Sequence, residues 1–207
     1  MTPIYHLTHV DYLPRIIQAG GLWCDAERAR QGWDAVRIAY QHLKDRRARK
    51  PVPVCAGGTL ADYVPFYFAN RSPMLYAIHT GYVEGYSGGQ AGIVYLVASV
   101  ERAAESGCPW CFTDGHALEA FTRFFDELDS LTEVDWAVIE SWSWHNREDD
   151  FDRRRRKQAE FLVYRSFAWE CFHEVGVIDL GMKHRVEEAF GASGHRPLVS
   201  VRPRWYY

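Results

Sequence analysis

A single glutamate opens an apolar segment shortly after a run of five basic residues. Glu160 follows the basic run 153–157, and residues 161–164 are all large and apolar. Such a run predicts a buried strand, where a carboxylate without a function would be costly. We therefore expect Glu160 to be a working carboxylate at the mouth of a strand. The alternative is a surface ion pair worth ~0–1 kcal/mol, and the basic run is either a solvated face or a segment that follows phosphates.

The length of the chain limits its domain organisation. It has 207 residues, and no stretch rich in Pro, Gly or Ser is long enough to be a linker. We therefore expect one domain over residues 1–207 with one sizeable core. Strand-like segments outnumber helical ones in the second half and lack regular helical crossovers, which predicts an α+β fold with a largely antiparallel or split sheet.

Hydrophobic periodicity predicts the individual elements. Strands are expected at 3–8, 63–68, 93–97, 161–164, 175–180 and 198–201, and helices at 10–22, 40–49, 72–80, 119–125 and 183–189; segment 134–139 fits either. Asp11 is the expected N-cap of the first helix and Gly20 its C-cap. Pro65 excludes a normal central position for its strand, so we expect an edge or a strand end that lines a cleft. Met74 and Leu75 are expected in the core.

Charge and aromatic content restrict the ligand. The net charge is −3, which excludes the overall basic field of a general nucleic-acid binder, although local basic patches remain at 44–50 and 153–157. Aromatic residues make up 15% of the chain, which is a high fraction. Because flat rings stack on bases and on nicotinamide, this surplus favours a nucleotide or single-stranded nucleic acid. A Trp-rich core is the alternative.

Targeting signals and cysteine usage predict the compartment. No apolar stretch approaches the ~20 residues that span a bilayer, and the N-terminal residues form neither a basic leader nor an apolar signal region. We therefore expect a cytoplasmic protein with no membrane partner. The chain has five cysteines, an odd number that indicates reduced thiols in such a protein. Cys108 and Cys111 would need two more zinc ligands, and the other cysteines form no second pair, so we expect no metal site.

Several segments together resemble the DarT family, whose members are toxins that ADP-ribosylate single-stranded DNA with NAD. These segments are the first strand at 4–9, the Arg-rich excursion, 63–68 with 71–76, 112–116, 159–163 and 201–207. The resemblance covers nearly the whole chain, and the order and spacing of the segments are more specific than any one of them. It implies an ADP-ribosyltransferase-like fold with a split, largely antiparallel central β-sheet and flanking helices, which would hold NAD where the central strands part.

The resemblance also implies which residues bind NAD. They are His6, Leu7, Thr8, Gly20, Leu22, Arg47, Tyr67, Phe68 and Tyr76, with an NAD-binding excursion at about 24–50. His6 would hydrogen-bond the adenosine-side ribose, and Thr8 the nicotinamide amide. Tyr67, Phe68 and Tyr76 would wall the nicotinamide, where a ring face stabilises positive charge. From the residues alone, His6 and Thr8 also fit a satisfied strand-end pair, and the rings, Phe68 above all, fit core packing.

Catalysis is implied for Glu160, Arg47 and Arg46. Glu160 would hold the 2′-hydroxyl of the nicotinamide-side ribose and balance the positive charge that develops as the glycosidic bond breaks. The acceptor in this family is a base nitrogen, whose proton must be removed or polarised. Arg47 is the favoured residue for this task, with Arg46 beside it, and we expect an electrostatic role because Arg is a poor base. Phosphate contact alone is the alternative, especially for Arg46.

Substrate selection is implied for a loop at about 115–160. Its candidate DNA or pyrophosphate contacts are His116, Trp142, Trp144, His145, Arg153 and Arg154. Rings that stack unpaired bases, together with cations that follow a backbone, are typical of single-stranded DNA binding. The expected partners are therefore single-stranded DNA and a cognate DarG-like macrodomain antitoxin, and we expect a monomer.

These implications predict a toxin that transfers ADP-ribose from NAD to a base of single-stranded DNA and releases nicotinamide. The sequence resembles the thymine-directed branch of the family most closely. The alternatives are transfer to guanine, an NAD glycohydrolase or RNA-directed transferase on the same fold, and a non-catalytic single-strand-binding module. A binding module would leave Glu160 and the pair of His6 and Thr8 unexplained.

Overall fold

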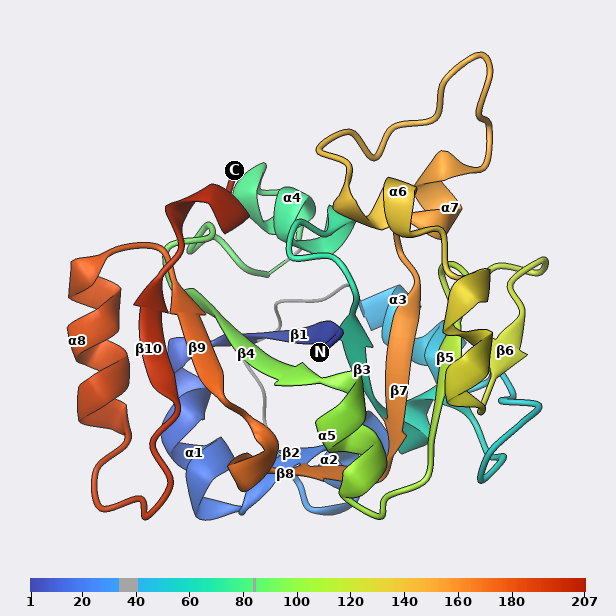
Figure 1. The fold of residues 1–207 in the computed structure, drawn as a ribbon. Helices are drawn as coiled ribbons and strands as arrows, with labels where there is room; N and C mark the ends of the chain where they lie inside the picture. The colour runs from blue at the N-terminus through green and yellow to red at the C-terminus, as the bar shows by residue number, and fades with distance from the viewer. Residues whose placement is uncertain (34–40, 84) are drawn as a thin grey trace.

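The computed structural model describes residues 1–33, 41–83 and 85–207, and its strands form one large sheet and one short ribbon (Figure 1). The large sheet has the order β10-β9-β4-β1-β3-β7-β5-β6, and β2 pairs with β8 in the ribbon. The strands are β1 (Pro3–His9), β2 (Gly21–Trp23), β3 (Tyr63–Tyr67), β4 (Ile93–Ser99), β5 (Trp110–Thr113), β6 (Phe124–Phe125), β7 (Glu160–Tyr164), β8 (Ser166–Ala168), β9 (Glu174–Val177) and β10 (Leu198–Val201). Of the strand pairs in the described ranges, β9 with β10 is parallel and the others are antiparallel. The expected α+β class with a largely antiparallel sheet is confirmed.

Short helices surround this sheet. They are α1 (Leu13–Gln18), α2 (Asp25–Arg30), α3 (Gln41–Arg47), α4 (Pro73–His79), α5 (Val100–Glu105), α6 (Trp136–Glu140), α7 (Arg153–Arg156) and α8 (Leu180–Ala189), with 3-10 turns η1 (Val10–Tyr12), η2 (Leu60–Asp62), η3 (Leu128–Glu133), η4 (Trp169–Cys171) and η5 (Pro203–Trp205). Figure 1 shows α8 beside β10 at one side of the sheet, and α6 and α7 near the start of β7. Residues 34–40 of the expected excursion, with the expected start of its helix, lie outside the described residues.

Side-chain caps explain where several helices begin. Ser72 Oγ accepts the N–H of Leu75 at 3.2 Å, so α4 begins as the sequence predicts. Asp179 accepts the N–H of Met182 at 2.8 Å, which starts α8 earlier than expected. Asp11 was expected to cap the first helix, and this is wrong, because its own N–H donates to His9 Nδ1 at 3.3 Å. Gly20, with φ of +76°, follows the end of α1, as expected of a C-terminal glycine.

The helix expected at 119–125 is absent from this part of the described chain, which contains turns and the short strand β6. A β-hairpin takes its place. The N–H of Asp114 donates to the carbonyl oxygen of Arg123, and the Asp114 carboxylate accepts the N–H of Arg123 at 3.0 Å. These contacts join β5 to β6 and outweigh the local helical pattern. The ambiguous segment at 134–139 forms α6, which Asp135 caps through the N–H of Val138.

The large sheet is split between β1 and β3. β1 pairs with β4 along its whole length, but among the described residues it meets β3 at the single pair Tyr5 and Tyr67. Pro65 lies at this gap, and its carbonyl oxygen is 2.8 Å from Nδ1 of His6. The expected cleft-lining position of Pro65 is confirmed, whereas the edge position is wrong because β3 lies between β1 and β7. A proline is tolerated inside the sheet here because Pro65 has no ladder partner in β1, so no backbone N–H is needed at this position.

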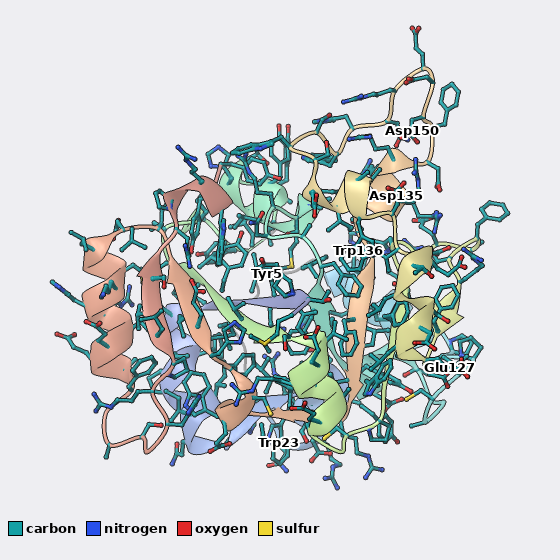
Figure 2. All side chains as sticks on the ribbon, in the orientation of Figure 1. Tyr5, Trp23, Glu127, Asp135, Trp136 and Asp150 are labelled. Atoms are coloured by element: carbon teal, nitrogen blue, oxygen red, sulfur yellow. The ribbon has the colours of Figure 1, made fainter. Side chains whose placement is uncertain are left out.

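Aromatic side chains fill much of the interior. The largest fully buried side chains include Trp169, Tyr63, Tyr95, Phe66 and Phe161. Figure 2 shows side chains packed around the sheet on both sides, with Tyr5 near its centre. Core packing therefore accounts for much of the aromatic surplus. No helix within the described ranges is both long enough and apolar enough to cross a membrane.

Candidate active site at the split of the sheet

A cleft opens where β1 and β3 separate. β1 contributes His6, Leu7 and Thr8, β3 contributes residues 65–67, and Arg47 and Glu160 come from the end of α3 and the start of β7. The other lining residues are Tyr12, Trp23, Asp25, Arg28, Leu43, Lys44, Met74, His116 and Leu118. The fold thus brings together the first strand, the excursion and the β7 glutamate.

Glu160 is buried at the cleft, with a relative exposure of 3%. Its Oε2 accepts from Nη1 of Arg47 at 2.8 Å, and its Oε1 accepts the N–H of Ala117 at 3.1 Å. Burial alone would raise the pKa of Glu160, but Arg47, His116 and the Ala117 N–H together hold it below its ordinary value. Glu160 is therefore an oriented carboxylate anion. The cation that binds it comes from α3, and not from the neighbouring basic run.

Arg47 is the buried cation of the site. The paired side chains of Arg47 and Glu160 are only 14% and 5% exposed. Burial would lower the pKa of Arg47, but the Glu160 carboxylate keeps it above its ordinary value. Its Nη2 is buried and has no hydrogen-bond partner among the described residues. A buried N–H without an acceptor is costly, so the site has one donor available for a ligand.

Arg46, the other catalytic candidate, lies differently. It is exposed and does not line the cleft, although it is the direct neighbour of Arg47 in α3. Successive helical residues point in different directions, so only one of the two can face Glu160. The structure therefore brings Arg47, and not Arg46, to the carboxylate.

His6 is a neutral group in the wall of the cleft. Burial lowers its pKa to about 4, and Nδ1 is 2.8 Å from the carbonyl oxygen of Pro65. A neutral ring in this position donates its Nδ1 proton to that oxygen, which leaves Nε2 as an acceptor. Thr8 is buried on the same strand. Tyr67 lines the opposite side, and burial, together with the charge of Glu160, raises its pKa well above its ordinary value.

His116 also lines the cleft, close to Glu160. Its Nδ1 accepts the N–H of Leu118 at 3.1 Å, and burial lowers its pKa. A neutral His116 therefore has its Nδ1 occupied and its Nε2–H available to donate. His116 therefore lies in the same cleft as Glu160, and not on the outer surface of the loop.

Other candidates for NAD binding lie outside the main cleft. Phe68 is buried in the core against Phe112, Trp136 and Phe161. Tyr76 makes edge contacts on α4, with Trp144 and Tyr207, and is not a lining residue. Gly20 follows α1, where its carbonyl oxygen accepts the N–H of Trp169. Leu22 lines a smaller adjoining groove together with His6 and Trp33.

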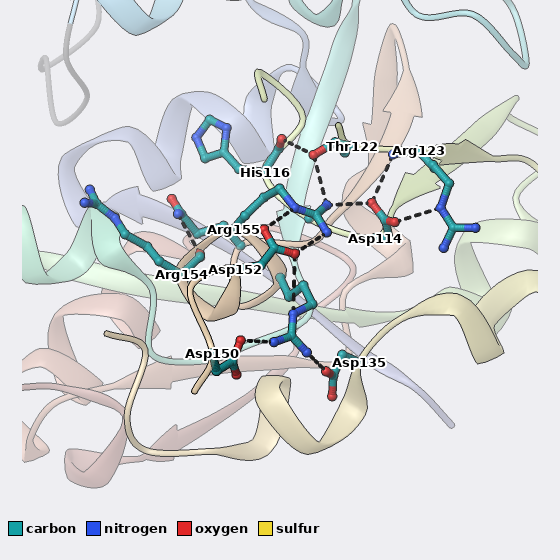
Figure 3. Close-up of polar contacts among 12 residues, drawn as sticks. Asp114, His116, Thr122, Arg123, Asp135, Asp150, Asp152, Arg154 and Arg155 are labelled. Carbon is teal, nitrogen blue, oxygen red and sulfur yellow. Dashed lines mark hydrogen bonds and ion pairs between the residues drawn. The ribbon is translucent and has the colours of Figure 1, made fainter. Parts of the chain in front are cut away.

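The basic run forms α7, and most of its charge is used inside the molecule (Figure 3). Arg155 pairs with Asp114 at 2.8 Å and with Asp152 at 2.7 Å. Arg156 pairs with Asp135 and Asp150, and Arg153 Nε donates to the carbonyl oxygen of Ser143 at 2.9 Å. The next residue, Lys157, is buried and donates to the carbonyl oxygens of Ile139 and Ser141. Arg154 is the exposed member of the α7 run.

The aromatic candidates of the loop differ in exposure. Trp142 is 67% exposed, and the Arg71 guanidinium lies 4.7 Å from its ring centre. Trp144 is buried and stacks on His145, with ring centres 4.0 Å apart. The side chain of His145 faces solvent. Trp142 and His145 therefore present free surface to a ligand, whereas much of the Trp144 ring contacts the protein.

Sequence reasoning did not single out several lining residues. Lys44 and Arg28 each lie 3.5 Å from Asp25, so the wall near α2 carries its own ion pairs. The signal in the sequence that could have identified Lys44, Arg28 and Asp25 as lining residues was their charge within the predicted NAD-binding excursion. Met74 packs against the core cluster that contains Leu75, as expected, although its side chain is only partly buried and also lines the cleft. Leu75 is fully buried, as expected.

The described residues contain no cluster of three or more His, Cys, Asp or Glu side chains that could hold a metal ion. Cys111 is buried in the cluster around Leu60 and Tyr63, whereas Cys108 packs at the edge of the main core. The two thiols therefore lie in different environments. The cleft therefore combines the buried pair of Glu160 and Arg47 with neutral hydrogen-bonding groups, and its wall near α2 carries the separate ion pairs of Asp25.

Comparisons with known proteins agree on one family. The model of "ssDNA thymidine ADP-ribosyltransferase, DarT" matches residues 5–207. A DNA ADP-ribosyl transferase of Thermus aquaticus is 43% identical over 208 residues, covering 100% of this chain and 89% of that protein. A structure of Thermus sp. 2.9 DarT in complex with ADP-ribosylated ssDNA has a TM-score of 0.92 at 41% identity and covers 100% of this chain and 96% of the other. Another structure of that DarT, in complex with NAD+, has a TM-score of 0.86 at 38% identity, with coverage of 100% and 98%.

Proposed function

The chain belongs to the DarT family of ssDNA thymidine ADP-ribosyltransferases, and from this premise we propose that it transfers ADP-ribose from NAD to a thymine of single-stranded DNA. Family membership confirms the resemblance found in the sequence and supports the enzyme class, the co-substrate NAD and single-stranded DNA as the acceptor. The choice of thymine and the roles of individual residues are further parts of the proposal.

The buried pair of Glu160 and Arg47 carries this proposal. The pair lies in the cleft at the split, and Arg47 Nη2 is a buried donor with no acceptor among the residues described. A purely structural pair would be expected to satisfy all of its buried donors. Neutral His6 and Tyr67 add hydrogen-bonding groups that carry no competing charge. These residues fit a polar, sugar-containing nucleotide better than a metal ion or an apolar ligand.

His6, Thr8 and Tyr67 would hold NAD in this cleft. His6 Nε2 is an acceptor for a ribose hydroxyl because Nδ1 is engaged with the Pro65 carbonyl oxygen. Thr8 offers a hydroxyl to the nicotinamide amide, and Tyr67 offers an aromatic wall beside the nicotinamide-side ribose. NAD supplies the ADP-ribosyl group, because the bond from its ribose C1′ to nicotinamide breaks and both electrons leave with neutral nicotinamide.

Glu160 would stabilise the charge that develops on the ribose. Its anion is fixed by the Ala117 N–H, so it needs little reorganisation when positive charge appears at C1′. The same carboxylate can accept a hydrogen bond from the 2′-hydroxyl. Both interactions strengthen as the glycosidic bond breaks, which is the condition for raising the rate.

Arg47 would act on the accepting base. A thymine ring nitrogen must release its proton to solvent as it forms the new bond to C1′. Until that bond is complete, the developing negative charge spreads to the neighbouring carbonyl oxygens. The unpartnered Nη2 of Arg47 is suited to donate to such an oxygen. Because the pKa of Arg47 is raised further by Glu160, Arg47 stabilises this charge as a cation and is a poor proton acceptor.

The surface beside the cleft supports a single-stranded substrate. Arg154, Trp142 and His145 are exposed on the loop or on α7, where they can contact phosphates and unpaired bases. Arg153 and Trp144 would support this surface from within the protein, since their side chains are largely buried. A cognate macrodomain antitoxin remains the expected protein partner, and the protein is expected to act as a cytoplasmic monomer.

Mass spectrometry of modified oligonucleotides tests the proposal. The panel consists of single strands that differ only in one central base, each incubated with NAD and protein. We expect a mass gain of one ADP-ribose on the thymine strand and no gain on the guanine strand. Glu160→Gln should abolish the gain, whereas Glu170→Gln, which changes an exposed glutamate on η4, should not.

Each other result would contradict a different part of the proposal. A gain on guanine strands would contradict the thymine assignment but keep the enzyme class. Free nicotinamide without an adduct on any strand would indicate an NAD glycohydrolase. Full activity of Glu160→Gln would contradict the role of the carboxylate, and no consumption of NAD would leave a binding module as the remaining interpretation.

A further inference from the structure

A short turn at residues 114–118 holds the catalytic carboxylate from the side opposite Arg47. The N–H of Ala117 donates to Oε1 of Glu160, whereas Arg47 binds Oε2. The two oxygens therefore have different partners. Oε1 is bound by backbone that cannot leave without moving the turn, and Oε2 is bound by a side chain that can change its rotamer.

Thr113 connects this turn to the backbone of Glu160. The ladder between β5 and β7 ends at the pair Phe112 and Phe161, so the next pair in register would be Thr113 and Glu160. At that position the Thr113 hydroxyl replaces a backbone acceptor: Oγ1 accepts the N–H of Glu160 at 3.0 Å. The same hydroxyl donates to the carbonyl oxygen of Gly115 at 2.7 Å. One fully buried hydroxyl thus fixes both the glutamate backbone and the turn.

Arg155 supports the turn from its other side (Figure 3). Its Nη1 donates to Asp114 at 2.8 Å, and its carbonyl oxygen accepts the N–H of His116 at 2.9 Å. Gly115 is in close contact with it, because a Cβ on Gly115 would lie 2.3 Å from Arg155 Nη1. Arg155 therefore holds the turn on both sides of Gly115, where there is no space for a side chain.

We propose that Thr113 and Arg155 are positioning residues, which fix the turn 114–118 so that one oxygen of Glu160 stays anchored while the other faces the substrate. This inference rests on the proposed function and adds to it a source of the orientation of the carboxylate. Neither residue lines the cleft, so each acts through Glu160. An error of about 1 Å in the position of a catalytic group can cost about 10²-fold in rate, which makes such an anchor important.

The test compares Thr113→Val with Thr113→Ser in steady-state transfer of ADP-ribose to a thymine oligonucleotide. Valine keeps the shape but loses the hydroxyl, and serine restores the hydroxyl. We expect kcat to fall about 10- to 100-fold in Thr113→Val with little change in KM for NAD, and to recover in Thr113→Ser. Thr80→Val is the matched control, because its hydroxyl is exposed at the end of α4.

The pH profile separates positioning from general stability. The Ala117 N–H is one of the groups that lower the pKa of Glu160. Loosening the turn should therefore move the acid limb of kcat/KM to higher pH in Thr113→Val and leave it in place in Thr80→Val. A fall in activity that only follows the folded fraction, with an unmoved acid limb, would overturn the proposal, as would wild-type kcat in Thr113→Val.

Arg155→Gln and Gly115→Ala keep the inference testable if Thr113→Val does not fold. Arg155→Gln removes the ion pairs that support the turn, and Gly115→Ala inserts a methyl group against Arg155. Both should lower kcat and shift the same acid limb, and wild-type behaviour of both would overturn the inference. Absence of any ADP-ribose adduct on the thymine oligonucleotide with the wild-type protein is a different outcome, which would contradict the proposed function itself.

Discussion

The arginine in the cleft and the arginines in α7 use their charge in opposite ways. In the cleft, Arg47 faces the single carboxylate of Glu160 and keeps one buried donor without a partner within the described residues. In α7, Arg155 and Arg156 each form ion pairs with two carboxylates, which accept hydrogen bonds from their guanidinium groups. The first arrangement is a site that can accept a ligand, and the second is a scaffold. The number of arginines in a segment therefore says less about function than the number of guanidinium N–H donors that have no acceptor within the protein.

Breaking the buried pair is expected to have the largest effect. Arg47→Met leaves Glu160 buried and without its partner, which costs about 3–5 kcal/mol in the free energy of unfolding. Activity should fall by about 10²- to 10³-fold, because the variant loses an electrostatic group at the reacting atoms. Urea unfolding and the initial rate of oligonucleotide modification measure the two effects.

The double variant Arg47→Met with Glu160→Gln separates stability from function. It removes both charges, so we expect it to recover much of the stability that Arg47→Met loses. Its activity should stay at the background level. Equal stability of Arg47→Met and the wild type would show that the pair is not buried in solution.

The pH dependence of stability sharpens the comparison on the cleft side. The pKa of His6 in the folded protein is about 4, below its ordinary value of 6.5, because of burial. Between these values the unfolded chain binds the proton and the folded protein does not, so His6 makes stability fall as pH decreases from 6.5 towards 4. His6→Asn keeps a donor for the Pro65 carbonyl oxygen and lacks this titration.

The measurement is the difference in unfolding free energy between the wild type and His6→Asn at several pH values. The nearby groups Asp25 and Arg28 are present in both proteins, so their direct effects largely cancel. The wild type should lose stability relative to His6→Asn below pH 6.5. A difference that does not change with pH would mean that His6 is as free to ionise in the folded state as in the unfolded chain.

The position of Glu160 at the start of a buried strand was predictable from the sequence, because a continuous apolar run is a local signal. Its partner was less so. Arg47 lies 113 residues away, and composition alone placed Glu160 beside the basic run that follows the loop. The choice of Arg47 over Arg46 came from resemblance, and only the orientation of α3 explains it physically.

Errors in the predicted elements have a similar cause. Residues 119–125 have a helical pattern, but Asp114 binds the backbone of Arg123 and closes a hairpin. The contacts of α7 were also hidden, since its carboxylate partners come from separate segments such as Asp114 and Asp135. Local patterns predicted the apolar strands β3, β4 and β7 and the start of α4, whereas they cannot show which distant charge completes a pair.

A variant in the α7 scaffold should have a moderate effect on stability and little on chemistry. Arg156→Met removes the pairs with Asp135 and Asp150, both partly buried, and we expect a loss of about 1–2 kcal/mol. For a chain of this size, that corresponds to a lower Tm by roughly 2–8 °C. Calorimetry measures this shift, and Arg147→Met, at an exposed position in the loop, is the control. A large loss of kcat well below Tm would contradict the scaffold role of Arg156.

The smallest effect is expected for Arg154, the exposed arginine of the scaffold segment. Arg154→Gln should change the free energy of unfolding by less than about 0.5 kcal/mol, because its side chain is exposed and its guanidinium lies as far as 5.7 Å from the ring centre of Trp144. If it meets a phosphate, the slope of log K against log salt for single-stranded DNA should become shallower by about 0.7.

Arg153→Gln is the matched comparison for this measurement, since Arg153 precedes Arg154 in α7 but bonds to the protein through Ser143. We expect Arg153→Gln to lower stability and to leave the salt slope nearly unchanged. Equal slopes for the wild type and Arg154→Gln would remove Arg154 from the DNA interface. The converse result, a shallower slope for Arg154→Gln alone, would show that a segment built as a scaffold still has one cation free for the substrate, because α7 turns one side chain of its run outward.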